Sequence, residues 1–227
     1  MASQHLTPYT PPDPFRSQRL IYRAAEDNEE DQKFIHEHLN EPAKQLLSTM
    51  VLPHPRTKVN AAHFLAAQQA RLLGVIICLP PDETGTEPEP NPGGAGDSRT
   101  RSVHELLSSR KPIPIGRLSL RDTMGAGTQH HRNAIMGISI TDSARGKGYG
   151  REAINWALDW AFEIAGLHRV SLEVLSTNEG ALGLYRSIGF VEEGRQREAI
   201  WQFRKWHDVV ILGMLEGEWL RLRGREE

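Results

Sequence analysis

Cysteine is nearly absent from this chain, which has one among 227 residues, so a disulfide framework within the chain is excluded. Cys78 stands in the apolar run from Val75 to Leu79, which predicts a buried core thiol rather than an exposed nucleophile. A chain without disulfides suits a reducing compartment. Because no apolar segment of a secretory signal is visible near Met1, we expect the cytoplasm or the nucleus.

An excess of charge of either sign is also absent, as is any long apolar run. The 27 Lys and Arg residues nearly balance 29 Asp and Glu residues, and the net charge of -2 argues against a nucleic-acid partner. No segment approaches the roughly 20 apolar residues of a membrane span, so no membrane partner is expected. The ten histidines show no paired metal spacing, and we expect no metal.

Composition along the chain indicates one domain over residues 18–222, because 227 residues can bury a single core well. Residues 1–17 are rich in proline and predict a flexible N-terminal arm. Residues 81–100 are dense in Pro, Gly, Glu and Asp with little to bury, which predicts a disordered insertion. Residues 223–227 form a short tail.

Hydrophobic periodicity predicts an α+β layer rather than a doubly wound sheet, because several strands follow one another without intervening helices. A helix after Gly150 has its apolar residues at helical spacing, and Gly166 can end it. Another helix lies between 174 and 190. The remaining predicted helices are 26–39, 43–50 and 59–69, and the predicted strands are 19–23, 73–79, 113–120, 134–140, 169–174, 190–195 and 208–215.

A glycine-rich hexapeptide runs from Arg145 to Gly150, after a predicted strand and before a predicted helix. Its alternating glycines let the backbone turn sharply and leave no Cβ against a ligand. The first amides of the following helix have no intrahelical acceptor and favour phosphate. Arg145 and Lys147 add charge, so a polyphosphate ligand is predicted. The spacing fits neither the P-loop nor the dinucleotide fingerprint, and a flexible surface turn is the alternative.

A second pattern lies one helix and one strand further on: Asn-x-x-Ala-x-x-Leu-Tyr from Asn178, then Gly189-Phe190. With the Arg-x-x-Gly-x-Gly loop before it, this resembles the signatures of the GNAT acetyltransferases, which hold acetyl-coenzyme A. The resemblance covers residues 20–218 in outline and reaches motif level over 135–193. It implies α/β/α layers around a mixed, mostly antiparallel twisted sheet, with acetyl-CoA as co-substrate.

The resemblance also implies two catalytic residues. Tyr185 would protonate the departing thiolate, and the alternative is a phenol that bonds within the core. Glu173 would be the base, directly or through water. Because Glu173 is opposite in phase to its apolar strand neighbours, a merely solvated carboxylate would look the same. The intact spacing between the two favours an enzyme over a catalytically silent CoA-binding or protein-interaction domain.

Binding of acetyl-CoA is implied for main-chain groups of one strand and for the glycine loop. Asn178 could both cap the helix that it precedes and reach the pantetheine arm. The implied binding residues are Ile138, Ser139, Ile140, Arg145, Gly146, Lys147, Gly148, Tyr149, Gly150 and Asn178.

The acceptor amine is left open between a polyamine and a peptide or protein amine. The chain resembles the branch that contains ribosomal-protein N-terminal and spermidine acetyltransferases. A polyamine needs carboxylates near the cleft, and Trp201 and Trp206 could line an acceptor groove, form the contact of a homodimer, or simply pack. The candidate carboxylates for a polyamine are Glu26, Asp27, Glu29, Glu30, Asp31, Glu37 and Glu41.

Overall fold

The computed structural model of the protein describes residues 13–81, 111–123, 125 and 127–225. Residues 82–100 of the predicted insertion and residues 1–12 of the predicted arm lie outside the described residues. The described part of the arm packs on the domain: the Trp156 indole donates to the Pro14 carbonyl (2.9 Å), and the Ser17 hydroxyl donates to Glu152 (2.7 Å).

A seven-stranded sheet with strand order β1-β2-β3-β4-β5-β7-β6 forms the centre of the described chain. Only β4 and β5 are parallel, and every other neighbouring pair is antiparallel. The mixed, mostly antiparallel α+β sheet predicted from the sequence is therefore confirmed. The strands are β1 (Ile21–Ala24), β2 (Leu73–Leu79), β3 (Ile113–Asp122), β4 (Asn133–Ile140), β5 (Arg169–Leu175), β6 (Val191–Gln202) and β7 (Lys205–Leu215).

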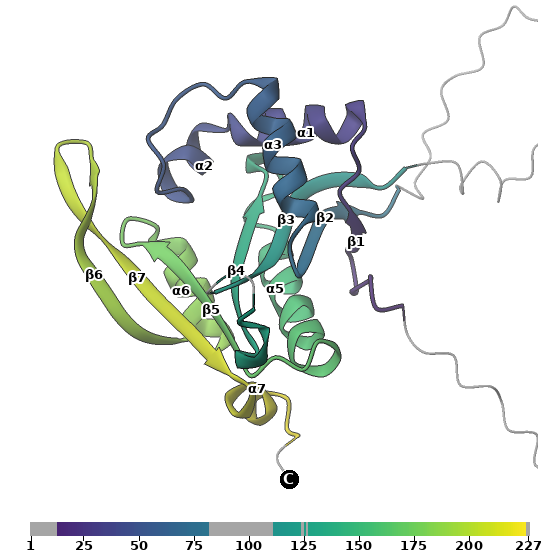
Figure 1. Cartoon of the computed structure of the whole chain (residues 1–227), viewed down its shortest axis with the longest axis vertical. Coiled ribbons are helices and arrows are strands. Elements are labelled where there is room, and N and C mark those ends of the chain that lie inside the picture. Colours follow the sequence, from purple (N-terminus) through teal and green to yellow (C-terminus); the bar gives the residue numbers. More distant parts are fainter. Residues whose placement is uncertain (1–12, 82–110, 124, 126, 226–227) are drawn as a thin grey trace, which may run out of the picture.

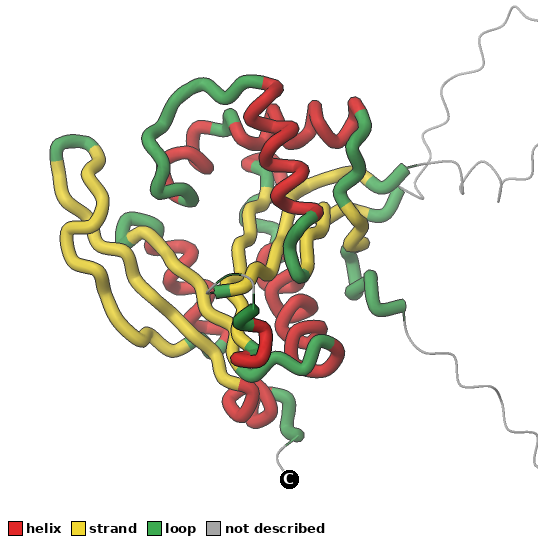
Figure 2. The backbone as a smooth tube through the Cα atoms, viewed as in Figure 1, coloured by secondary structure: helices red, strands yellow, loops and turns green. Residues whose placement is uncertain are grey.

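Helices cover both faces of this sheet. Figure 1 shows α1, α2 and α3 gathered beside the β1–β4 half, while α5 and α6 lie behind the strands. Figure 2 shows that much of the C-terminal half is strand, and that β6 and β7 form one long projecting hairpin. The helices are α1 (Glu29–Leu39), α2 (Pro42–Leu47), α3 (Lys58–Gln69), α5 (Tyr149–Asp159), α6 (Glu179–Ile188) and α7 (Glu216–Leu222).

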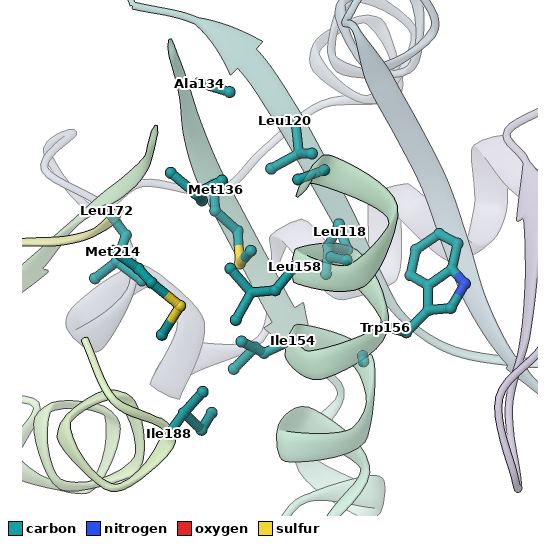
Figure 3. Packing of buried hydrophobic residues seen from close by; sticks show 14 of the residues in the cluster. Leu118, Leu120, Ala134, Met136, Ile154, Trp156, Leu158, Leu172, Ile188 and Met214 are labelled. Atoms are coloured by element: carbon teal, nitrogen blue, oxygen red, sulfur yellow. The ribbon is translucent and has the colours of Figure 1, made fainter. Parts of the chain in front are cut away.

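The main core lies between the sheet and α5, α6 and α7. Every second side chain along each strand points to this face. The apolar face of α5 packs against these side chains, as the spacing of its apolar residues predicted. In Figure 3, Ile154 and Leu158 of α5 point toward Met136 of β4. A smaller cluster lies on the opposite face under α1 and α3, and it contains Cys78. The prediction of a buried thiol is confirmed, and burial raises its pKa to about 11.

Strand β6 (Val191–Gln202) is about twice as long as the strand predicted over 190–195, and two helical elements also differ from the sequence-based expectation. The helix after the glycine loop ends in a π-helical turn, Trp160–Ile164, before Gly166 at φ 61° stops it. Helix α7 was not predicted, and its Trp219 is buried against the core, where the indole donates to Asp159 (2.9 Å). None of the helices in the described ranges has the length and apolar character needed to cross a bilayer.

Candidate functional site

The two parallel strands at the centre of the sheet separate partway along their length. Strand β4 pairs with β5 only from Asn133 to Ile135, and β5 continues beside β7 alone. Beyond Ile135, β4 therefore has an edge without a strand partner, whose backbone N–H and C=O groups face the gap. A cavity of about 670 Å³ opens there, between the start of α5, helix α6 and the segment that follows α2.

The glycine loop forms one wall of this cavity. Gly146 (φ 74°) and Gly148 (φ 83°) have left-handed conformations that residues with a Cβ rarely adopt, and α5 begins directly after Gly148. Within the described residues, the backbone amides from Gly146 to Arg151 have no hydrogen-bond acceptor. With the positive end of the α5 dipole, they form a site that fits a phosphate or diphosphate.

Arginine side chains fix the shape of this loop. The Arg145 guanidinium donates to the Ile140 carbonyl (3.1 Å) and pairs with Asp142 (2.8 Å), so it holds the end of β4 to the loop. Arg19, which sequence reasoning missed, donates to the Lys147 carbonyl (3.1 Å) and lies over the Tyr149 ring (4.8 Å). Its ion pair with Glu152 (2.7 Å) ties the segment before β1 to α5.

The opposite wall contains the two residues predicted to be catalytic. Glu173 is exposed on β5, and its side chain lies on the opposite face of the strand from the buried Leu172 and Val174. Tyr185 on α6 is packed edge-on against Phe190, with ring centroids 5.8 Å apart. Burial raises the pKa of Tyr185 to about 12, so its hydroxyl stays protonated at neutral pH. No described residue forms a hydrogen bond with that hydroxyl.

Asn178 joins two walls of the cavity. Its side-chain oxygen accepts from the Ala181 amide (3.2 Å), which confirms the predicted helix cap. Its side-chain nitrogen donates to the Leu47 carbonyl (3.0 Å) at the end of α2. Asn178 thus positions the segment after α2 over the cavity.

The structure brings eleven of the twelve predicted site residues to this one cavity, and the exception is Lys147, whose exposed side chain does not line it. None of the seven carboxylates considered for a polyamine lines it either; Glu173 is its acidic lining residue. Sequence reasoning missed Arg117 of β3, which lines the cavity beside Ser139. No group of side chains suited to a metal ion occurs among the described residues.

A second hollow of about 620 Å³ adjoins the first between α2 and the hairpin, and Leu47 lines both. Phe203 and His207 of the hairpin also line it. Trp201 and Trp206 do not: they pair across the hairpin with ring centroids 5.1 Å apart and are each 55% exposed.

Comparison with known proteins identifies the family. The sequence profile described as the Acetyltransferase (GNAT) family matches residues 21–190, which is most of the chain, so the chain belongs to that family. The resemblance found in the sequence is thereby confirmed. The spermidine N(1)-acetyltransferase of Vibrio cholerae is 39% identical over 90 residues, covering 40% of this chain and 52% of that protein. The putative ribosomal N-acetyltransferase YdaF of Bacillus subtilis is 33% identical over 91 residues, covering 40% and 50%.

A solved structure shows the same fold. The crystal structure of spermidine N-acetyltransferase from Vibrio cholerae in complex with CoA and spermine superposes with a TM-score of 0.62 at 24% identity. The superposition covers 90% of this chain and 99% of that one. In sequence, however, the matches to the two curated relatives span only about half of each relative's length.

Proposed function

We propose that this protein is an N-acetyltransferase that moves the acetyl group of acetyl-CoA to a primary amine. The observation that carries the proposal is the convergence of the loop amides, the open edge of β4 and the Tyr185 hydroxyl on one cavity. These three features match the three parts of the donor: the diphosphate, the pantetheine amides and the thioester. Membership of the GNAT family supports the same donor.

The donor would lie along the gap between β4 and β5. Its diphosphate fits the unpaired amides after Arg145, where the helix dipole and the loop glycines favour phosphate oxygens. Its pantetheine amides can pair with main-chain groups of Ile138, Ser139 and Ile140, as an added strand would. The thioester then reaches the cavity between Glu173 and Tyr185.

Transfer removes two protons from the acceptor nitrogen and delivers one to the departing sulfur. An alkylammonium has a pKa of about 10.4, so reaching the neutral amine near pH 7 costs roughly 4–5 kcal/mol. That first proton leaves to solvent. As the amine nitrogen bonds to the thioester carbonyl carbon and the carbon–sulfur bond breaks, Glu173, directly or through water, takes the second proton from the nitrogen. Tyr185 donates its proton to the departing sulfur. Water then carries the proton from Glu173 back to Tyr185, which restores both groups.

Two classes of acceptor amine are each supported by a different observation. The relatives named as spermidine acetyltransferases favour a polyamine. The second hollow beside α2 favours a peptide or protein amine, because it gives an extended chain a place next to the cavity. Both acceptors present the primary amine that the chemistry requires.

The function is tested by following release of free CoA when the purified protein is mixed with acetyl-CoA and a panel of amines. The panel contains spermidine, spermine, peptides with free N-termini and lysine-containing peptides. We expect turnover with at least one of them and calorimetric binding of CoA. Binding without turnover for every amine would instead support a silent CoA-binding domain, and absence of CoA binding would remove the proposal.

Replacing Gly148 with Ala should weaken binding of acetyl-CoA about 5- to 30-fold, because a left-handed alanine costs roughly 1–2 kcal/mol and the loop amides would shift to relieve it. The Cβ itself would meet only the flexible end of Arg19, at 3.3 Å. Gly166→Ala is the matched control, since Gly166 is also left-handed (φ 61°) and its Cβ would meet nothing within 4 Å, but it does not line the cavity. Titration calorimetry with CoA measures both, and equal affinities would contradict the assigned loop.

A further inference from the structure

Two basic side chains beside the cavity, one buried and one half-buried, have no acidic partner among the described residues. Lys44 of α2 is 4% exposed, and its ammonium has no hydrogen-bond partner among the described residues. Its nitrogen lies 5.4 Å from the centroid of the Phe64 ring, and the Arg117 guanidinium lies 4.3 Å from the same centroid. The Arg117 Nε is also buried and unpaired in the part of the chain that the structure describes.

Another arginine on the same row of the sheet does have an acidic partner. On the same row of the sheet, Arg23 pairs with Ile76, which in turn pairs with Arg117. Arg23 has its acid, because Asp31 accepts from its guanidinium at 2.5 and 2.7 Å. No described carboxylate lies within ion-pair distance of Arg117 or Lys44. A buried cation without a counter-charge is costly, so Arg117, and Lys44 when it is protonated, favour a bound anion.

Glu41, the acidic residue beside these two cations, already has other partners. Glu41 lies 3.1 Å from the His38 ring nitrogen and accepts weakly from the Asp142 amide (3.4 Å). Among the charges that act on Lys44, that of Glu41 raises the pKa of Lys44, whereas those of Arg117, Arg56 and Arg145 lower it. Burial, followed by these arginines, lowers the pKa of Lys44 to about 6, and burial lowers the pKa of His38 to about 2. The cluster is therefore short of negative charge.

The cluster opens into the proposed reaction site. Arg117 lines the cavity, and so does Ser139, which pairs with it across β3 and β4. Ser139 is 6% exposed, and its buried hydroxyl has no hydrogen-bond partner among the described residues. Alternation places Arg117, Ser139 and Glu173 on one face of the sheet, opposite the main core. The cavity thus presents a carboxylate at β5 and the Arg117 guanidinium at β3, while Lys44 of α2 lies beside Arg117 and outside the lining.

We propose that the acceptor carries a carboxylate beside its amine, and that Arg117, Lys44 and the Ser139 hydroxyl bind this carboxylate while the amine faces Glu173. This rests on the proposed function, since it names the acceptor of the same reaction. A guanidinium and a hydroxyl suit a carboxylate well, because charged hydrogen bonds of this kind are short and strong. The second ammonium of a polyamine would instead lie beside the like charge of Arg117 and be repelled by it.

The carboxylate could belong to a free amino acid or to an acidic side chain near the N-terminus of a peptide, and two substrate pairs distinguish these sources. The first pair is methionine and methioninamide; the second is a pair of heptapeptides, Ser-Glu and Ser-Gln at their N-termini and otherwise identical. Spermidine is the third arm. With the unaltered protein, we expect kcat/KM to be at least about tenfold higher for the carboxylate member of one pair.

Variants then test which residues bind the carboxylate of the acceptor. Arg117→Gln and Lys44→Met should each abolish the preference mainly through KM, while CoA affinity stays unchanged. Arg71→Gln is the matched control, because Arg71 is also half-buried with an unpaired Nε but does not line the cavity. Lys58→Met on the exposed start of α3 is the control for Lys44. Both controls should keep the preference.

The outcomes separate this inference from the proposed function. Transfer with equal kcat/KM within both pairs, or best transfer to spermidine, would overturn the carboxylate site and leave the acetyltransferase intact. A preference that survives in both Arg117→Gln and Lys44→Met would overturn the assigned residues. Absence of transfer to every amine would overturn both proposals. If either variant fails to fold, the substrate pairs on the unaltered protein still decide.

Discussion

Tyr185→Phe should lower kcat by about 10²–10⁴ while the KM for acetyl-CoA changes little. The substitution removes only the hydroxyl, so the edge-on contact with Phe190 and the wall of the cavity remain. Because burial raises the pKa of Tyr185 to about 12, its ionisation should not limit the rate below about pH 11. Steady-state rates of CoA release at saturating acetyl-CoA, measured from pH 6 to 10, provide the check.

Tyr22→Phe is the control for the loss of a buried tyrosine hydroxyl. Burial raises the pKa of Tyr22 as well, but its hydroxyl contacts Ser17 (2.9 Å) and it does not line the cavity. We expect its kcat to be unchanged and its stability to fall by about 1 kcal/mol. If Tyr185→Phe retains kcat within a few-fold of the unaltered protein, the Tyr185 hydroxyl serves packing and not proton transfer.

Local chemistry explains which parts of the site could be predicted from the sequence. The alternation of β5 assigns Glu173 to the face opposite Leu172, and the structure has it there. Asn178 caps α6 through a bond to a residue three positions away, a distance that a short pattern encodes. The glycines at 146 and 148 have the positive φ angles that make glycine necessary. Each of these features depends on neighbours within one turn or one strand.

The parts that could not be predicted depend on sheet register and on packing between distant segments. Arg117 lies beside Ser139 only because β3 pairs with β4, and it shares the Phe64 ring with Lys44 only because α2 and α3 pack together there. Nothing in the sequence around either residue marks it as buried, since Lys and Arg are usually exposed. The acidic run that leads into α1 could be seen in the sequence but does not reach the cavity. Most of it is exposed away from the cavity, and Asp31 is used within the fold.

Asp31→Ala should destabilise the folded protein by about 3–5 kcal/mol, because it leaves the partly buried Arg23 guanidinium without its counter-charge. It also removes the acceptor of the Glu26 backbone amide (2.8 Å) at the approach to α1. For a domain of this size, such a loss corresponds to a fall in melting temperature of roughly 6–20 °C. Urea unfolding followed by circular dichroism gives the free energy directly.

Glu30→Ala is the matched control one position earlier in the helix. Glu30 pairs with Lys111 at 2.7 Å, but both side chains are exposed, so we expect a loss below about 1 kcal/mol. Equal losses for the two variants would contradict the assigned role of Asp31.

The stability difference caused by Asp31→Ala should also depend on pH. Burial alone would raise the pKa of the Asp31 carboxyl, but the hydrogen bond from Arg23 outweighs it with the help of the Glu26 amide, and the net shift is downward. A carboxyl whose pKa is lower in the folded state contributes its stability above the unfolded pKa of about 3.9 and loses it as the pH falls through the folded value. The difference between Asp31→Ala and the unaltered protein should therefore be full at pH 7 and shrink below about pH 4. A difference that stays constant down to pH 2.5 would mean that lost packing, and not the charge of Asp31, explains the effect.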